Sequence, residues 1–191
     1  QPWSGIKRDQ PRPNPGEVEK IIDYNVNRIL AQRGITWTQI HHALEDKMEY
    51  STFARYADPE RKTQWERSQH KDHSRRRWRV DLVCDIAVFL QVRVQTLITL
   101  TEDFDPLRTE PALPDYSRAT SVFARKLREL KQQTGCTWTQ LHQATGIPVS
   151  TLKQYAMDQR KSGTLNVMCR IAAHFGMKLE DMIVDKQLPD P

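Results

Sequence analysis

Apolar residues recur along most of the chain at spacings of three or four positions, which is the period of an α-helix that buries one face. Val26, Ile29 and Leu30 follow this spacing in the first half, and Val122 and Leu127 follow it in the second. A third apolar stripe near the C-terminus comprises Val167, Met168, Ile171, Ala172 and Phe175. No segment shows the sustained alternation of apolar and polar residues that is typical of a half-buried strand. The pattern therefore predicts an all-α protein.

The chain also repeats itself. Residues 36–41 read TWTQIH, and residues 137–142 read TWTQLH. Further matches follow in the same order, pairing Ser51-Thr52 with Ser150-Thr151, Cys84 with Cys169, Ile86-Ala87 with Ile171-Ala172, and Leu97-Ile98 with Met182-Ile183. The first repeat carries two extra residues before Ser51 and about fourteen more between Ala57 and Cys84, and such insertions belong in loops. We therefore expect two tandem domains of about five short helices each.

Proline marks the expected boundaries, because it breaks helices. Pro2, Pro11, Pro13 and Pro15 lie near the start of the sequence, and Pro106, Pro111 and Pro114 lie between the two repeats. The predicted division is an extended arm at 1–16, a first domain at 17–101, a linker at 102–115, a second domain at 116–185, and a tail at 186–191.

The net charge of the chain and its distribution bear on the kind of binding partner. The 191 residues carry a formal net charge of +5, and residues 58–79 hold eight basic and four acidic residues. A basic balance is compatible with a polyanionic partner. No apolar run approaches the roughly 20 residues that span a bilayer, so no membrane partner is expected.

The second repeat contains the most informative stretch. Thr137 is a good N-cap for a short helix, with Gln140 as its capping-box partner. Gly146 suits a tight turn, and Pro148 suits the first turn of the next helix. Leu152 is expected to face the core while polar residues surround it. A short helix, a glycine turn and a polar-faced helix together predict a helix-turn-helix, whose second helix enters the major groove.

From Ser121 to Val184 this run resembles the Xre family, the lambda-repressor/Cro-like regulators. The resemblance implies a lambda-repressor-like fold and a sequence-specific transcription regulator that binds double-stranded DNA, of bacterial, phage or mobile-element origin. Trp138 stands where the family often has Gln, and His142 stands where it usually has Ala. The first repeat departs further, because it lacks the turn glycine and carries three acids in its longer connection, namely Glu45, Asp46 and Glu49.

The resemblance also implies which residues meet DNA. In the second domain Val149, Ser150 and Lys153 are the base-reading residues, and Gln154 and Arg160 lie nearer the DNA backbone. The matching positions of the first domain are Tyr50, Ser51, Ala54 and Arg55. Arg55 could contact guanine through two hydrogen bonds. The basic insertion could track phosphates through Arg75, Arg76 and Arg77, with Trp65 and Trp78 beside them.

Other notable residues have simpler interpretations. Trp37 and Trp138 sit in identical contexts and are expected to be domain-core or helix-packing residues rather than stacking platforms. Cys84 and Cys169 share one position on an apolar stripe and are expected to be buried small hydrophobes. The odd count of three cysteines, with no C-x-x-C pair, favours a reducing compartment and hence the cytoplasm.

Three functions compete at this point. The leading one is DNA-binding regulation, in which two motifs in one chain could read two half-sites without a homodimer, or a homodimer could read four. The alternative is a protein-interaction regulator, antitoxin-like or antiactivator-like, in which one repeat binds a protein. An enzyme is disfavoured, and no cofactor is expected, because acid-base pairs are scattered and neither a glycine-rich phosphate loop nor metal-ligand spacing occurs.

Overall fold

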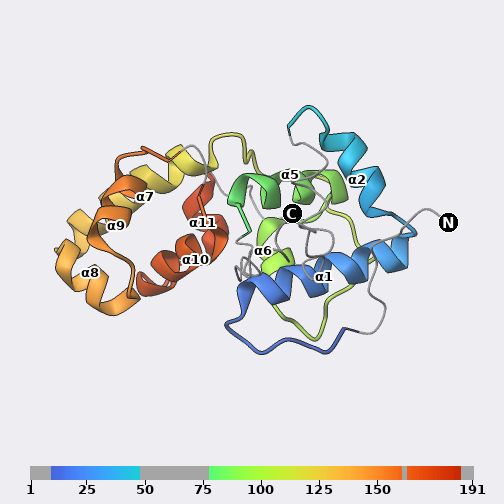
Figure 1. Ribbon diagram of the computed structural model, residues 1–191, viewed down its shortest axis with the longest axis horizontal. Helices are drawn as coiled ribbons and strands as arrows, with labels where there is room; N and C mark the ends of the chain where they lie inside the picture. The colour runs from blue at the N-terminus through green and yellow to red at the C-terminus, as the bar shows by residue number, and fades with distance from the viewer. Residues whose placement is uncertain (1–9, 48–77, 161–162, 186–191) are drawn as a thin grey trace, which may run out of the picture.

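The computed structural model describes residues 10–47, 78–160 and 163–185. Within these ranges the secondary structure is nine α-helices, with no named strand, as the apolar periodicity predicts. In chain order the helices are α1 (Val18–Arg33), α2 (Trp37–Leu44), α5 (Val80–Leu90), α6 (Val94–Ile98), α7 (Ala119–Thr134), α8 (Trp138–Thr145), α9 (Val149–Ala156), α10 (Leu165–His174) and α11 (Leu179–Ile183) (Figure 1).

Two sets of helices correspond in order and length. We call residues 17–101 the N-terminal half and residues 116–185 the C-terminal half. α1 and α7 each have 16 residues and end at a left-handed glycine, Gly34 or Gly135, with φ 66° in both. α2 and α8 each have eight residues and follow a threonine capping box, while α6 and α11 each have five residues. The residues that the sequence repeat aligns with α9 lie outside the described ranges.

Each half packs its helices in the same way. α1 contacts α6, and α2 contacts α5, while α7 contacts α11 and α8 contacts α10. The apolar stripes face these contacts, so that Val26 and Ile29 of α1 and Leu127 of α7 are fully buried. In the C-terminal half α9 also packs against α7 and α8. The helical spacing seen in the sequence is therefore the spacing of core-facing residues.

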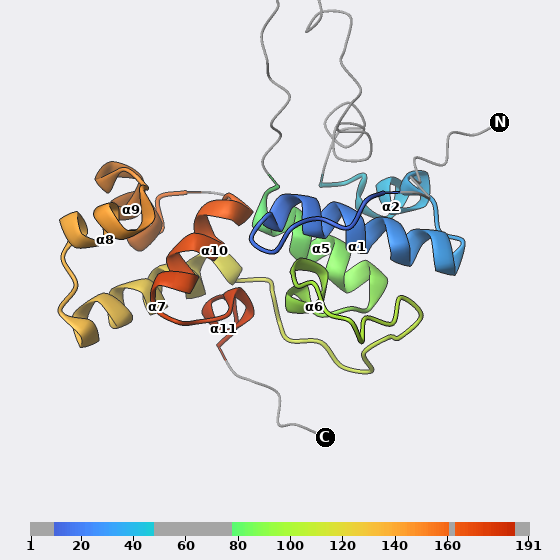
Figure 2. The ribbon, with the colours of Figure 1, turned by 90° about the horizontal axis from the view of Figure 1, so that it is seen from below.

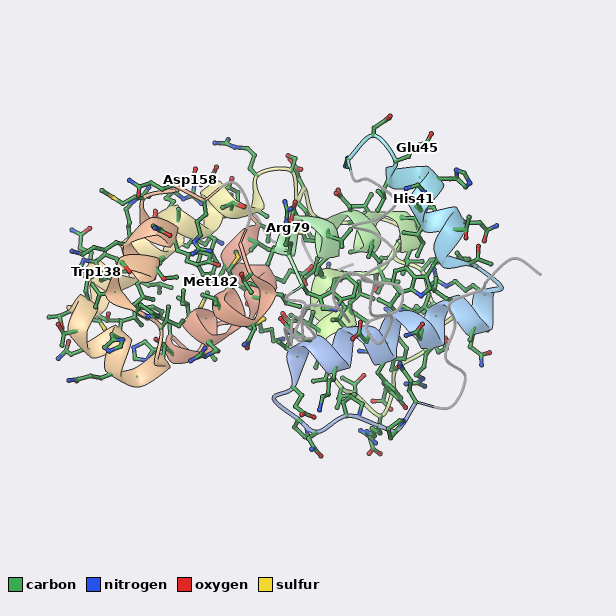
Figure 3. All side chains as sticks on the ribbon, in the orientation of Figure 1. His41, Glu45, Arg79, Trp138, Asp158 and Met182 are labelled. Carbon is green, nitrogen blue, oxygen red and sulfur yellow. The ribbon has the colours of Figure 1, made fainter. Side chains whose placement is uncertain are left out.

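The two halves meet along a continuous buried core rather than as separate bodies. One cluster of buried apolar residues extends from α1 through α5 and α6 into α7, α10 and α11. Just before α5 and α10 the backbones of Arg79 and Thr164 form an isolated antiparallel bridge. Figure 3 shows Arg79 at the middle of the molecule, between Trp138 near one end and Glu45 toward the other.

The proline-rich segment between the halves lacks helix, as its composition predicts, but it is packed down. The guanidinium of Arg33 donates hydrogen bonds to the carbonyls of Leu90, Pro106 and Arg108. Phe104 is buried, with the Arg28 guanidinium 4.8 Å from its ring centroid. The segment therefore lies against the N-terminal half, and the division into domains remains a prediction.

A buried polar contact ties the C-terminal half to α6. The hydroxyl of Tyr116 accepts a hydrogen bond from the Val94 amide at 3.2 Å and donates one to the Glu180 carboxylate. Burial raises the pKa of Glu180, although the hydrogen bond from Tyr116 and the charge of Arg93 act in the opposite direction. Burial also raises the pKa of Tyr116, so its hydroxyl stays protonated and remains a donor.

The raised pKa of Glu180 predicts a pH-dependent stability. Its contribution is complete below the reference pKa of 4.5 and is lost as the pH rises through the higher folded-state value. The parent's stability relative to Glu180→Gln should fall as the pH rises from ~4 toward neutrality, by about 1.4 kcal/mol per unit of pKa difference. Urea titrations across this range measure the difference.

A matched control is Glu129→Gln, because Glu129 is exposed on α7. That variant should follow the pH profile of the parent. A difference between the parent and Glu180→Gln that stays constant with pH would show that the buried carboxyl does not titrate with folding.

Candidate nucleic-acid interface

The first helix of the motif, α8, begins as the sequence predicts. The Gln140 amide donates to Thr137 Oγ1 at 3.2 Å, and the Thr137 amide donates to Gln140 Oε1 at 2.9 Å. This capping box satisfies two backbone donors that the helix leaves unpaired. Leu141 is buried, whereas His142 and Gln143 are exposed. α8 is thus fixed at its start and presents a polar outer face.

The turn after α8 depends on a glycine. Gly146 has φ 69°, in the left-handed region, and its amide donates to the His142 carbonyl at 2.7 Å. A Cβ at this position would also lie 3.2 Å from the Nη2 of Arg170, which donates to the Thr145 carbonyl. Arg170 therefore connects α10 to the turn and helps to set the angle between α8 and α9.

The second helix of the motif, α9, carries the predicted reading face. It begins at Val149, and Pro148 is its N-cap rather than its first residue. Leu152 is buried, as expected, and Tyr155 is buried as well. The predicted base-reading and flanking residues lie on the outer side: Ser150, Lys153 and Gln154 are exposed and Val149 is half-buried.

Arg160 lies just beyond α9 and is held in place. Its guanidinium carbon is 4.9 Å from the centroid of the Tyr155 ring, and its Nε donates to Gln154 Oε1 at 3.2 Å. Tyr155 is itself fixed, because its hydroxyl accepts a hydrogen bond from the Thr164 amide at 2.8 Å. The structure thus brings Gln154 and Arg160 together at the end of the predicted reading helix.

Positive charge is concentrated in the same half. Residues 116–185 contain ten basic and five acidic residues, a balance of +5, whereas residues 102–115 contain one basic and five acidic residues. A duplex carries one negative charge per ~1.7 Å of its axis, so it would favour the C-terminal half over the linker segment.

The two tryptophans of the repeat are buried to different extents. Trp138 is half-buried and packs against the core, as a helix-packing residue does, and the Lys131 ammonium lies 4.6 Å from its ring centroid. Trp37, in the identical sequence context, is fully buried and donates from Nε1 to Asn27 Oδ1 at 3.3 Å. The second repeat has no Asn at the matching site, because Arg128 occupies it. The two tryptophans therefore share the same local sequence but face different residues on the preceding helix.

The predicted sites of the N-terminal half fall largely outside the described residues. This holds for Tyr50, Ser51, Ala54 and Arg55, and for Trp65 and the run Arg75, Arg76 and Arg77. Trp78 is described and corrects an expectation. It is buried and donates from Nε1 to Asp23 Oδ1 at 3.1 Å, so it packs in the core and does not track phosphates.

The end of α2 also contrasts with the motif turn of the C-terminal half. Its C-cap, Glu45, is in the right-handed helical region at φ −60°, where α8 has a left-handed glycine. Glu45 and Asp46 are exposed, and Glu45 projects at the upper edge of the molecule near His41 (Figure 3). These acids are poor partners for phosphate.

Two contributors escaped the sequence argument. Arg170 and Lys131 hold the turn and the Trp138 ring, but their partners are far enough along the chain that no local pattern signals them. Cys84 is buried as expected, whereas Cys169 is only half-buried, and burial raises the pKa of each thiol to about 12. Both thiols therefore stay protonated near neutral pH.

Residues 126–187 match the family model described as the Cro/C1-type HTH DNA-binding domain. Over these residues the C-terminal part of the chain is similar to Cro/C1-type helix-turn-helix domains. The match contains α8, the Gly146 turn, α9, α10 and α11, and no second copy was detected elsewhere. Comparisons with curated proteins and with solved structures gave no match.

Two further findings concern other kinds of site. Among the described residues, no group of three or more His, Cys, Asp or Glu side chains could hold a metal ion. Within the same described ranges, no helix is both long and apolar enough to cross a membrane.

Proposed function

We propose that this protein is a sequence-specific transcription regulator that reads double-stranded DNA through the outer face of α9. The observation that carries the proposal is the Cro/C1-type domain, with its buried Leu152 and Tyr155 and its exposed Ser150 and Lys153. In such a domain the start of the second motif helix reaches the base edges, and phosphate contacts flank it.

The residues divide into two roles under this proposal. Val149, Ser150 and Lys153 face the groove floor, where a lysine can donate to the guanine acceptors and a serine can bond either base edges or phosphate. Gln154 and Arg160 contact the sugar-phosphate backbone of the DNA, because their mutual hydrogen bond and the Tyr155 ring hold them at the end of α9. Arg75, Arg76 and Arg77 remain proposed phosphate contacts.

We further propose that the N-terminal half is a second, diverged copy. The matching helix lengths, the two capping boxes and the two left-handed glycines support this common plan. A regulator of bacterial, phage or mobile-element origin, acting in the cytoplasm, fits the resemblance and the three free cysteines.

The test is a pair of lysine variants. Lys153→Ala should weaken binding to the cognate duplex roughly 5- to 150-fold and relax the preference at one or two base pairs, because a good base contact contributes about 1–3 kcal/mol. Its melting temperature should match that of the parent, because Lys153 is exposed. Duplexes selected from a random pool supply the cognate site for a fluorescence titration.

Lys178→Ala is the matched control. Lys178 is also exposed, but it precedes α11, which lies toward the opposite side of the molecule from α9 (Figure 2). This variant should keep the parental base preference. Equal binding by the parent and a folded Lys153→Ala would remove α9 from the proposed reading role.

A second function, protein binding by the N-terminal half, is favoured by one observation. Glu45 and Asp46 are exposed at the end of α2, where a DNA-binding motif would favour positive charge. A salt titration on duplex DNA tests the first function, because phosphate contacts make log affinity fall linearly with log salt, whereas a chain that binds only protein gives no such duplex binding.

A further inference from the structure

The contact between the halves is reciprocal, as in a two-fold symmetric dimer. The Val80 amide donates to the Gly163 carbonyl at 2.9 Å, and the Leu165 amide donates to the Trp78 carbonyl at 2.7 Å. The sequence repeat that aligns Cys84 with Cys169 also aligns Val80 with Leu165 and Trp78 with Gly163. Each bond is thus the counterpart of the other under exchange of the halves.

The contacts between helices are also equivalent when the two halves are exchanged. α1 contacts α10, and its counterpart α7 contacts α5, which is the counterpart of α10. α6 and α11 are counterparts of each other and touch directly, as elements beside a symmetry axis do. In Figure 1 a half-turn in the plane of the picture exchanges α2 with α8, α1 with α7, and α5 with α10.

One pair of equivalent positions lies in direct contact between the halves. The Glu180 amide donates to Gln95 Oε1 at 3.4 Å, and the repeat aligns Gln95 with Glu180. Equivalent positions meet only beside a two-fold axis, so this bond marks where the axis that relates the halves passes.

We propose that the chain is the single-chain equivalent of a repressor dimer and binds, as a monomer, one duplex with two inverted, non-identical half-sites. The proposal rests on the proposed function of α9. A duplex has its own local two-fold axes, and two-fold motif pairs read half-sites ~10 base pairs apart, one helical turn, or multiples of that spacing. Figure 2 shows α9, and α2 as the counterpart of α8, toward one side of the molecule, with α6 and α11 toward the other. The described parts of both motif regions can therefore face one duplex.

The first experiment is the stoichiometry of the full chain on a duplex that it selects from a random pool. Light scattering should give a monomer alone and one chain per duplex. Footprinting should protect two half-sites of different sequence, and Lys153→Ala should alter the preference in only one of them. Scrambling either half-site should weaken binding roughly 100-fold or more, since linked modules gain from effective concentration.

Two chains per duplex, or protection of a single half-site, would overturn the proposal. The latter result would assign the N-terminal half to protein binding. If the chain binds no duplex with an affinity that falls as salt rises, the proposed function itself fails. The pairing of the two halves within one chain can still be tested separately.

The separate test is the hydrogen exchange of the amides that bridge the halves. Gln95→Ala should speed hydrogen exchange of the Val80 and Leu165 amides, because it removes the side chain that accepts the Glu180 amide at the contact. Gln143→Ala, at an exposed position of α8, should keep the parental rates. Parental exchange rates in a folded Gln95→Ala variant would show that this position does not control the pairing.

Discussion

Alanine in place of Trp37 is expected to lower the free energy of unfolding by about 3–5 kcal/mol, the range typical of a large aromatic removed from a core. The side chain is 1 % exposed and packs within the shared core, so its loss leaves a cavity. It also leaves the buried Asn27 without the hydrogen bond from Trp37 Nε1. Urea titrations followed by circular dichroism measure the change.

Trp138→Ala is the matched control, because it removes the same side chain from the same local sequence. Trp138 is half-buried, so less apolar area returns to water and the Lys131 contact contributes only about 0.5–1 kcal/mol. The effect should be clearly smaller than that of Trp37→Ala. Equal effects would mean that the two tryptophans share one environment, contrary to the structure.

The comparison of the two tryptophans shows where sequence reasoning succeeds and fails. Capping boxes, turn glycines and apolar stripes depend on neighbours in the chain, so Thr137, Gly146 and the buried Leu152 were predictable. The environment of a tryptophan depends on another helix. Asn27 on α1 accepts a hydrogen bond from the buried Trp37, whereas Arg128 at the matching position of α7 donates to the Ala156 carbonyl and leaves the half-buried Trp138 without such a partner on that helix.

Trp78 illustrates the same limit for the site. Its neighbours in the chain are arginines, which suggested a surface role, yet it is 3 % exposed and bonded to Asp23 on α1. A tryptophan that donates its one N–H to a carboxylate can be buried without an unpaired polar atom. Nothing within a few residues of Trp78 identifies Asp23, 55 positions away, as the partner.

The contact between the halves was beyond sequence reasoning for a similar reason. The repeat predicts two similar units, but not whether they pack together or move apart. The reciprocal bonds of Val80 and Leu165 join backbone atoms, and backbone atoms are the same at every non-proline position. In the bond between Gln95 and Glu180, Glu180 also takes part through its backbone amide, so only Gln95 contributes a side chain to it.

The second large effect is expected at the core face of the reading helix. Leu152→Ala should lower the free energy of unfolding by roughly 2–5 kcal/mol, because the side chain is 0 % exposed where α9 packs on α7 and α8. The neighbouring residue Lys153 is exposed, so the two positions separate stability from DNA reading. Loss of duplex binding in Leu152→Ala should follow the unfolded fraction and recover at temperatures where the variant is folded.

Met157→Ala is the control for this prediction. Met157 directly follows α9 and is 64 % exposed, so its removal should change the free energy of unfolding by no more than ~0.5 kcal/mol. If Leu152→Ala proved as stable as Met157→Ala, Leu152 would not be a core residue. Leu152→Ala that is fully folded yet unable to bind would instead show that α9 keeps its reading geometry only through this one core contact.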